Sequence, residues 1–242
     1  MLKDLVYGLR DLVYPPNCSI CEHVISSQLS QRSLCPQCIN NIIPNKPPFC
    51  PRCSRYLGQN IKHSLCHECR KHSLHFDFAW SACLYENPLK NLIYAFKYGQ
   101  KTHYRRCFAQ IMIDFVYKYN LDIHQFDFIA PIPLFSSRLR ERGYNQSYLL
   151  SAMIAEHFKI PLSTNALIRT RNSQSQTLFD KKERFTNISG AFTIKHPLEI
   201  RKKSILIIDD LLTTGATASE AALMLKNAQA KKAAVFTLAI TT

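Results

Sequence analysis

The stretch that decides the fold runs from Ser204 to Thr217 and reads Ser-Ile-Leu-Ile-Ile-Asp-Asp-Leu-Leu-Thr-Thr-Gly-Ala-Thr. Its branched apolar residues, Ile205 to Ile208, predict a strand that is buried on both faces, as in a parallel sheet. Two acids, Asp209 and Asp210, follow where we expect that strand to end. A turn of small residues comes next, and apolar residues at helical spacing predict a helix over 216–227. Backbone N–H groups of such a turn, at the positive end of a helix, suit a phosphate group, so the stretch predicts a sugar-phosphate site.

Two ordinary interpretations of this stretch compete with a ligand site. An apolar strand ending in Asp-Asp also resembles the start of a phosphate-accepting receiver domain, but such a domain needs several further strand–helix units and only 32 residues follow Asp210. The other alternative is a plain strand-to-helix turn with an acid capping the helix. Two acids, two threonines and a glycine all follow directly after the predicted strand, and this combination favours a ligand site over the receiver domain and over the plain turn.

The same residues resemble the 5-phosphoribosyl 1-pyrophosphate (PRPP) motif of type I phosphoribosyltransferases, in which four apolar residues and two acids precede Thr-Thr-Gly-Ala-Thr. The resemblance implies that Asp209 and Asp210 hold the ribose 2′ and 3′ hydroxyls of PRPP, which is used with Mg²⁺. It also implies which residues cradle the 5′-phosphate: Thr213, Thr214, Gly215, Ala216 and Thr217. Loss of pyrophosphate leaves positive charge on the anomeric carbon, and nearby carboxylates can stabilise that charge, so the two acids are also the candidate catalytic residues.

The composition is that of a basic globular protein. The chain has 242 residues with 46% hydrophobic content, enough for one large domain or two modest ones. Its formal net charge is +14, of which +5 falls in residues 1–75 and +9 in the remainder, so the basicity is spread along the chain. Such a balance favours anionic partners, either a phosphorylated substrate or nucleic acid.

No run of the sequence approaches the roughly 18 uncharged apolar residues that a membrane-spanning helix needs. Residues 1–14 predict an amphipathic helix that stops at Pro15-Pro16. Its acids, Asp4 and Asp11, argue against a secretory signal. We expect this helix to dock on its own domain, with contact to a membrane surface or to a partner as the alternative.

Eight of the ten cysteines form four Cys-x2-Cys pairs. Thirteen residues separate the first two pairs and twelve separate the last two, spacings typical of four-cysteine zinc sites. A two-residue gap lets both thiolates of a pair reach one ion, and two pairs complete a tetrahedron. The simplest assignment is sequential, with an interleaved one as the alternative. In the sequential assignment one ion is bound by Cys18, Cys21, Cys35 and Cys38, and the other by Cys50, Cys53, Cys66 and Cys69.

Disulfides and an iron–sulfur cluster are the competing uses of these cysteines. A chain without a secretory signal is expected in a reducing compartment, which favours zinc. Little apolar sequence lies between the pairs, so metal would supply the folding free energy of this segment. Cys83 and Cys107 fall outside the pattern and are predicted to be small buried apolar residues.

The cysteine pairs end near residue 71, and longer apolar patterns begin near Phe78. We therefore predict two domains, an N-terminal helix with the zinc-binding segment at 1–75 and a second domain at 76–242. In the second domain, strands are predicted at 78–85 and 126–132, and helices at 88–98, 104–119 and 145–158. The alternation of strands and helices predicts an α/β fold with a parallel sheet flanked by helices.

Two basic segments are candidates for further phosphate contacts. The loop predicted after the second strand carries three arginines whose forked guanidinium groups could clamp a pyrophosphate, with a solvated basic face as the alternative. They are Arg138, Arg140 and Arg142. The polar stretch 169–187, with Lys181 and Arg184, is predicted to be a long loop that closes over the ligand as a lid, with a disordered segment of no defined role as the alternative.

Over nearly its whole length, the order of these parts is similar to that of the ComF (ComFC) family of bacterial proteins tied to natural transformation. The resemblance rests on the cysteine pairs, the PRPP-like motif and three further runs: Arg-Leu-Arg-Glu-Arg-Gly-Tyr-Asn-Gln at 138–146, Gln-Thr-Leu at 176–178 and Arg-x-x-Asn-x-x-Gly-Ala-Phe at 184–192. It implies a type I phosphoribosyltransferase fold behind a small N-terminal double zinc ribbon. It further implies a cytoplasmic protein, or one at the inner face of the membrane, that helps to bring incoming single-stranded DNA into the cell together with DNA-uptake proteins.

The resemblance leaves the reaction open. One hypothesis is phosphoribosyl transfer from PRPP, with the zinc ribbons contacting DNA or a transformation partner. A second is a non-catalytic module that binds PRPP and nucleic acid, because no recognised residue is an evident base for activating an acceptor. A third, a nucleobase salvage enzyme, is disfavoured because such an enzyme does not need two metal ribbons. The candidates for lining the acceptor side are Tyr85, Lys97, Tyr98 and Tyr144.

Overall fold

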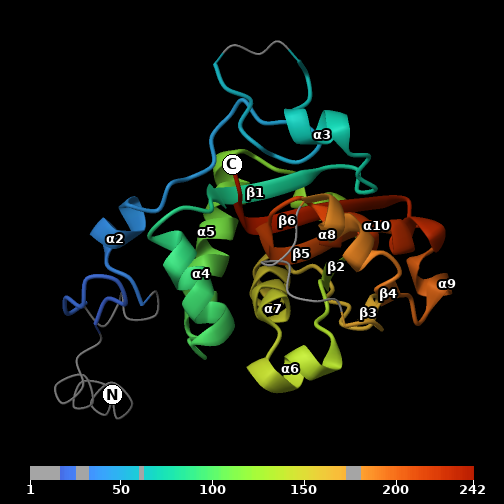
Figure 1. Cartoon of the computed structure of the whole chain (residues 1–242). Coiled ribbons are helices and arrows are strands. Elements are labelled where there is room, and N and C mark those ends of the chain that lie inside the picture. Colours follow the sequence, from blue (N-terminus) through green and yellow to red (C-terminus); the bar gives the residue numbers. More distant parts are fainter. Residues whose placement is uncertain (1–16, 26–32, 60–62, 173–180) are drawn as a thin grey trace.

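The computed structural model describes residues 17–25, 33–59, 63–172 and 181–242, and its central feature is a sheet of four parallel strands (Figure 1). The strands lie in the order β1–β6–β5–β2. Their bounds are Ala79–Leu84 for β1, Phe128–Pro131 for β2, Ser204–Leu212 for β5 and Lys232–Ile240 for β6. The two long apolar strands, β5 and β6, therefore occupy the centre, where both faces of a sheet are covered.

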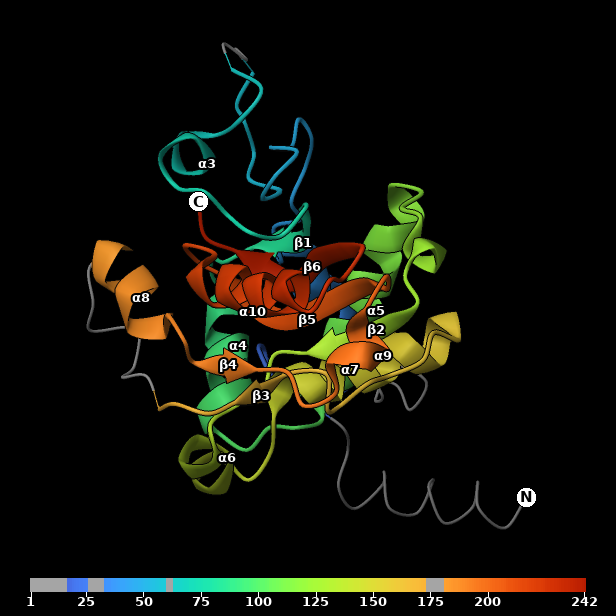
Figure 2. The ribbon, with the colours of Figure 1, turned by 90° about the vertical axis from the view of Figure 1, so that its right-hand side faces the viewer.

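Successive residues of β5 enter opposite halves of the core. Leu206 and Ile208 pack in the cluster that contains α4 (Leu89–Tyr98), α5 (Tyr104–Lys118) and α7 (Gln146–Phe158). Ile205 and Ile207 pack in the cluster that contains α10 (Ala216–Asn227). All four side chains are fully buried, as expected when helices cover both faces of a strand. Figures 1 and 2 show the resulting three layers.

The remaining elements are short. A small antiparallel sheet is formed by β3 (Ile168–Arg169) and β4 (Phe192–Thr193). The short helices are α2 (Pro36–Asn40), α3 (His67–Lys71), η2 (Ile123–Gln125), α6 (Ser136–Arg142), α8 (Lys181–Ile188) and α9 (Pro197–Ile200).

The predicted α/β architecture is confirmed, with a parallel sheet flanked by helices. The helix predicted over 216–227 has those same bounds in the structure. The strand after Ser204 is longer than predicted, because β6 continues beside it and pairs with Leu211 and Leu212 as well as with Asp209. The two acids therefore lie inside the hydrogen-bonded strand and not beyond its end.

Two segments predicted as loops contain helices. The arginine-bearing loop after β2 is helix α6, which ends at Gly143 in the left-handed conformation (φ +81°). The polar stretch 169–187 begins in β3 and includes most of α8, and residues 173–180 lie outside the described part of the chain. The loop prediction was therefore wrong for 136–142 and for 181–187, because it relied on polarity, which surface helices share with loops.

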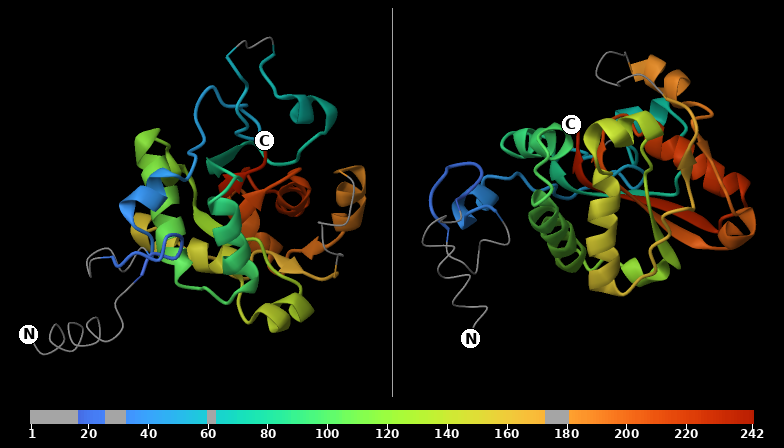
Figure 3. Two further views of the ribbon diagram at one scale, coloured as in Figure 1. Left: turned by 60° about the vertical axis from the view of Figure 1, so that its left-hand side comes forward. Right: turned by 90° about the horizontal axis from the view of Figure 1, so that it is seen from below.

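The two cysteine-rich segments lie at separate places on the α/β domain (Figure 3). The first, with α2, packs in the α4–α5–α7 cluster, and the second, with α3, packs in the α10 cluster. One isolated β-bridge, between Pro44 and Cys83, joins the chain between the two segments to β1. The domain boundary at residues 75/76 remains a prediction, and the helix predicted over 1–14 lies outside the described residues.

Within the described ranges, no helix is long and apolar enough to cross a membrane.

Candidate functional site

A cavity of about 630 Å³ opens at the carboxyl end of β5. Ligands of open α/β sheets bind at this edge, where the loops that follow parallel strands gather. The volume falls within the range of small-molecule sites, roughly 300–1,000 Å³. The cavity is lined from β5, the turn that follows it, the start of α10, and residues of α4, α6 and β3.

The turn between β5 and α10 forms one wall. Gly215 takes the N-cap position of α10 with φ +82°, a conformation that side-chain-bearing residues rarely adopt. A Cβ there would lie 3.5 Å from Leu74 Cδ2 and 3.6 Å from Phe76 Cε1, so residues preceding β1 support the turn from outside. The first N–H groups of a helix have no intrahelical partners, so the start of α10 offers donors to an anion.

The predicted phosphate-cradle residues are distributed unevenly around this turn. Thr213, Gly215, Ala216 and Thr217 line the cavity. Thr214 does not line it: its side chain is buried, and its Oγ1 accepts a hydrogen bond of 3.3 Å from the Ala216 N–H. Thr214 therefore shapes the turn.

The two acids lie side by side in the cavity and have different partners. The Ser147 Oγ–H donates a hydrogen bond of 2.7 Å to Asp209 Oδ1, which also accepts from the Asp210 N–H at 2.9 Å. Asp210, with a side chain only 2% exposed, forms an ion pair of 2.7 Å with Lys97 Nζ from α4. The acid pair is therefore fixed by one hydroxyl and one ammonium group before any ligand arrives.

The two carboxyl groups and Lys97 affect each other's protonation. Burial and the adjacent charge of Asp210 raise the pKa of Asp209 from 3.8 to about 7, although Lys97 and Ser147 act in the opposite direction. Burial alone would lower the pKa of Lys97, but the charges of Asp210 and Asp209 outweigh it and the pKa is raised. Lys97 is therefore a stable cation, and Asp209 exchanges its proton near neutral pH.

Two of the three predicted arginines reach the cavity. Arg138 and Arg142, four residues apart on α6, both line it, whereas Arg140 is exposed and does not. The prediction that alternate arginines act together fails for Arg140, because residues two apart on a helix point in different directions. Lys181 and Arg184 lie on α8, and their side chains are outside the described part.

Sequence reasoning missed two polar groups of the site and the role of a third. Arg169 on β3 lines the cavity, with its guanidinium 5.6 Å from the centre of the Phe192 ring, and burial lowers its pKa. Ser147 lies in the first turn of α7, just after the N-cap Asn145, and a serine is common at such a position, so nothing in the sequence indicated its contact with Asp209. Lys97 was named only for the acceptor side, and its ion pair with Asp210 had no sequence signal.

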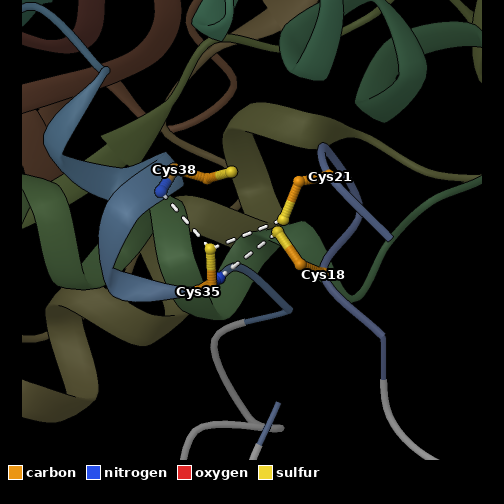
Figure 4. A group of neighbouring side chains, drawn as sticks. All are labelled: Cys18, Cys21, Cys35 and Cys38. Carbon is orange, nitrogen blue, oxygen red and sulfur yellow. Dashed lines mark hydrogen bonds between the residues drawn. The ribbon is translucent and has the colours of Figure 1, made fainter. Parts of the chain in front are cut away.

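The eight paired cysteines form two groups of four. Within each group the sulfur atoms lie within 4.8 Å of one another (Figure 4 shows the first group). The groups are Cys18, Cys21, Cys35 and Cys38, and Cys50, Cys53, Cys66 and Cys69. The sequential assignment is thus the one the structure shows.

These groups fit zinc. A tetrahedral ion with Zn–S bonds of about 2.3 Å places sulfur atoms about 3.8 Å apart, and the structure has 3.7 Å between Cys21 and Cys35 Sγ and 3.5 Å between Cys53 and Cys66 Sγ. Backbone N–H groups also approach the sulfurs, for example Cys35 N to Cys18 Sγ at 3.3 Å. Cys83 and Cys107 are buried outside both groups.

Arg55 joins the second cysteine group to the 213–217 turn. Its guanidinium donates to Cys53 Sγ at 3.6 Å, to the Thr241 carbonyl at 3.1 Å, and to the Thr213 carbonyl in a short hydrogen bond. One planar side chain thus connects a metal ligand, the end of β6 and the turn that lines the cavity.

Residues 9–70 match the double zinc ribbon domain model. The chain is 28% identical to competence protein F of Haemophilus influenzae, over 87% of this chain and 92% of that protein. It is 29% identical to competence protein ComFC of Bacillus subtilis, over 96% of each, and 26% identical to the DNA utilization protein YhgH of Escherichia coli, over 90% and 95%. The resemblance to the ComF family is confirmed.

Among solved structures, the ComF-like chain is similar to adenine phosphoribosyltransferase from Leishmania donovani, with 16% identity and a TM-score of 0.34 over 56% of this chain and 64% of that one. It is also similar to glutamine PRPP amidotransferase from B. subtilis, with 19% identity and a TM-score of 0.32 over 46% and 22%. The fold assignment itself rests on the parallel sheet and flanking helices described above.

Loss of the second metal site is expected to loosen the 213–217 turn, because Arg55 and the Leu74–Phe76 segment would lose their support. In Cys50→Ser and in Arg55→Lys, amides of this turn should exchange with solvent about tenfold faster, a change measured by hydrogen exchange with mass spectrometry. Cys18→Ser, which disrupts the first cysteine group, is the matched control for Cys50→Ser, and Arg106→Lys, at an exposed position on α5, is the control for Arg55→Lys. Equal exchange in Cys50→Ser and Cys18→Ser would contradict the connection.

The raised pKa of Asp209 predicts a pH-dependent stability. Between about pH 4 and pH 7 the unfolded chain has lost this proton and the folded chain keeps it, so this group lowers the free energy of unfolding as pH rises and has no further effect above its folded pKa. Relative to the wild type, Asp209→Asn should gain stability over that interval, measured by urea unfolding with the fluorescence of the single Trp80.

Ser147→Ala tests the titration of Asp209 by removing a hydrogen bond that lowers its pKa. The Ser147 hydrogen bond lowers the pKa of Asp209, so its loss should move the upper end of the interval to higher pH. A stability difference between wild type and Asp209→Asn that stays constant from pH 4 to pH 8 would refute the assignment.

Proposed function

We propose that this chain is a PRPP-binding protein of the phosphoribosyltransferase type that acts in natural transformation and supports the import of single-stranded DNA into the cytoplasm. The observation that carries the proposal is the acid pair beside a helix-capping turn in one cavity. Similarity to competence proteins over most of the chain supplies the biological setting.

The cavity offers a place for each part of PRPP. Asp209 and Asp210 would hold the ribose hydroxyls, and the 213–217 turn would receive the 5′-phosphate at the start of α10. Arg138, Arg142 and Arg169 line the same cavity and would bind the pyrophosphate oxygens. Mg²⁺ suits this set, because it is commonly held by one or two carboxylates together with substrate phosphates, and it would neutralise pyrophosphate charge.

The chemistry expected of these residues is electrostatic. Departure of pyrophosphate would leave positive charge at the anomeric carbon, and the paired carboxylates beside it would stabilise that charge. Because Asp209 has a pKa of about 7, its full negative charge is available only above neutral pH. Binding of the ribose hydroxyls would have to compete with Lys97 for Asp210.

A specific observation favours binding without turnover as the second candidate function. Burial raises the pKa of Tyr85, and the charges of the acids raise that of Lys97, so both stay protonated near neutral pH. The Tyr144 hydroxyl donates to the Phe96 carbonyl. None of these three acceptor-side candidates is therefore placed as a general base. Pyrophosphate release that depends on an added acceptor would separate an enzyme from a binding module.

Location and partners follow the same proposal. A protein that handles incoming DNA would work in the cytoplasm, or at the inner face of the membrane beside DNA-uptake proteins. The zinc ribbons are expected to contact DNA or one of those proteins. The net charge of +14 suits a polyanionic partner.

Replacement of both acids is expected to abolish PRPP recognition. Calorimetric titration with PRPP and Mg²⁺ should give at least a tenfold weaker affinity for the Asp209→Asn/Asp210→Asn variant, because charged hydrogen bonds to the ribose are lost. Asp114→Asn, an exposed site on α5, makes the same chemical change away from the cavity and should leave affinity unchanged. Equal affinity in wild type and the double variant would overturn PRPP binding.

The same variants test the biological role. A strain that lacks this gene should transform poorly, and the Asp209→Asn/Asp210→Asn variant should fail to restore transformation frequency, whereas Asp114→Asn should restore it. Immunoblots check that all variants accumulate equally. Full restoration by the double variant would show that the acid pair is not needed for transformation.

A further inference from the structure

An exposed aromatic pair stands at the rim of the cavity. Tyr94 and Tyr98 lie one turn apart on α4, with ring centroids 5.0 Å apart and planes inclined by 49°. They are 64% and 55% exposed, although the opposite face of the same helix is buried in the core. Both line the cavity that contains the acid pair.

Neither tyrosine of the pair has an evident role in stabilising the fold. Tyr117, an equally exposed tyrosine on α5, packs on Phe158 and shares a hydrogen bond of 2.9 Å with His157. By contrast, within the described ranges neither the Tyr94 nor the Tyr98 hydroxyl has a hydrogen-bond partner. Two large rings held in water on one helix face are therefore better explained by a ligand than by packing.

Positive charge surrounds the rings. The Arg142 guanidinium lies 5.1 Å from the centre of the Tyr98 ring, and Arg138, also on α6, lines the same cavity. Lys97 lies between the tyrosines in sequence, and a small hollow beside the main cavity is lined by Lys97, Tyr98, Gln100, Arg138, Glu141 and Arg142. Aromatic rings next to cations are the pattern by which proteins bind single strands, with bases on the rings and phosphates on the cations.

The second zinc ribbon contrasts with this surface. Its residues Arg52 and Arg55 donate to backbone carbonyls of the α/β domain, Arg52 to Phe76 and Arg55 to Thr213 and Thr241. These two guanidinium groups hold the ribbon against the α/β domain. Beside α4, the Arg142 guanidinium lies against the exposed Tyr98 ring and also donates to Gln146 Oε1, and Arg138 forms an ion pair of 3.2 Å with Glu141 at the protein surface.

We infer that Tyr94 and Tyr98, with Arg142, form a stacking platform for the bases of single-stranded DNA at the mouth of the cavity. The inference rests on the proposed function, because it names the surface that holds the strand next to the phosphoribosyl site. One or two bases stack on the tyrosines, and the adjoining phosphates contact Arg138 and Arg142. A strand held there presents a nucleotide to the acid pair.

Fluorescence anisotropy with a labelled oligothymidylate of 20 nucleotides tests the platform in the full-length, zinc-loaded protein. Stacking on aromatic side chains is worth roughly 1–3 kcal/mol per base, so Tyr94→Ala/Tyr98→Ala should bind about 10- to 100-fold more weakly than wild type. Tyr94→Phe/Tyr98→Phe keeps the rings and should stay within about twofold. Tyr117→Ala is the control for loss of an exposed tyrosine, and thermal unfolding checks that each variant is folded.

A strand without bases makes the test specific for stacking. Wild type should bind an abasic oligonucleotide of equal length about as weakly as the alanine variant binds oligothymidylate, and in the alanine variant the difference between the two oligonucleotides should vanish. The dependence of affinity on salt should be the same in wild type and the alanine variant, because the phosphate contacts remain.

Three results would overturn the platform. The first is an alanine variant that binds oligothymidylate within twofold of wild type, and the second is a phenylalanine variant that loses as much affinity as the alanine variant. The third is a wild-type protein that binds oligouridylate at least tenfold more tightly than oligothymidylate, which would assign the surface to RNA. If the wild type binds no single strand at all, the DNA part of the proposed function fails with the platform, whereas PRPP binding is measured separately.

Discussion

Four thiolates held within 4.8 Å of one another repel each other unless a cation lies between them, and much of this molecule depends on that constraint. In the second group, a bound cation would fix the chain around Cys53 and therefore Arg55, which donates to the Thr213 carbonyl. The residues after the group, Leu74 and Phe76, lie against Gly215. The turn that faces the ligand cavity is thus supported by a metal site formed more than 140 residues earlier in the sequence.

A second constraint is the placement of two adjacent carboxylates in one strand. Like charges so close destabilise each other, and the structure resolves this with different partners: Ser147 for Asp209 and Lys97 for Asp210. The result is an acid whose pKa lies near neutrality beside one neutralised by an ammonium group. The pair is therefore sensitive both to pH and to any ligand that competes with Lys97.

Local sequence predicted the main elements well, because each of them showed a clear pattern in neighbouring residues, such as an apolar run, apolar residues at helical spacing or regularly spaced cysteines. The apolar run at 205–208, the helix over 216–227 and the sequential cysteine groups were all readable from neighbouring residues. The class of fold followed from the alternation of strands and helices. The helix α6 was missed because polar composition does not distinguish a surface helix from a loop. Without that helix, the sequence could not show that Arg140 lies outside the cavity that Arg138 and Arg142 line.

The parts of the site that sequence could not supply depend on contacts between distant segments. Lys97 meets Asp210, Ser147 meets Asp209, and Arg169 enters from a two-residue strand. No local pattern marks such a residue, because a lysine or serine on a helix is common. Their roles emerge only once parallel strands bring the segments to one edge of the sheet.

The strand order also determines when this protein can fold during synthesis. The strand β6, which is the last to be made, lies between β1, the first, and β5. Until residues 232–240 have left the ribosome, β1 has no neighbouring strand in the four-stranded sheet. The cysteine groups need only residues 18–69 and can take up metal much earlier. The nascent chain therefore carries both cysteine groups well before it has the 213–217 turn that the second group supports.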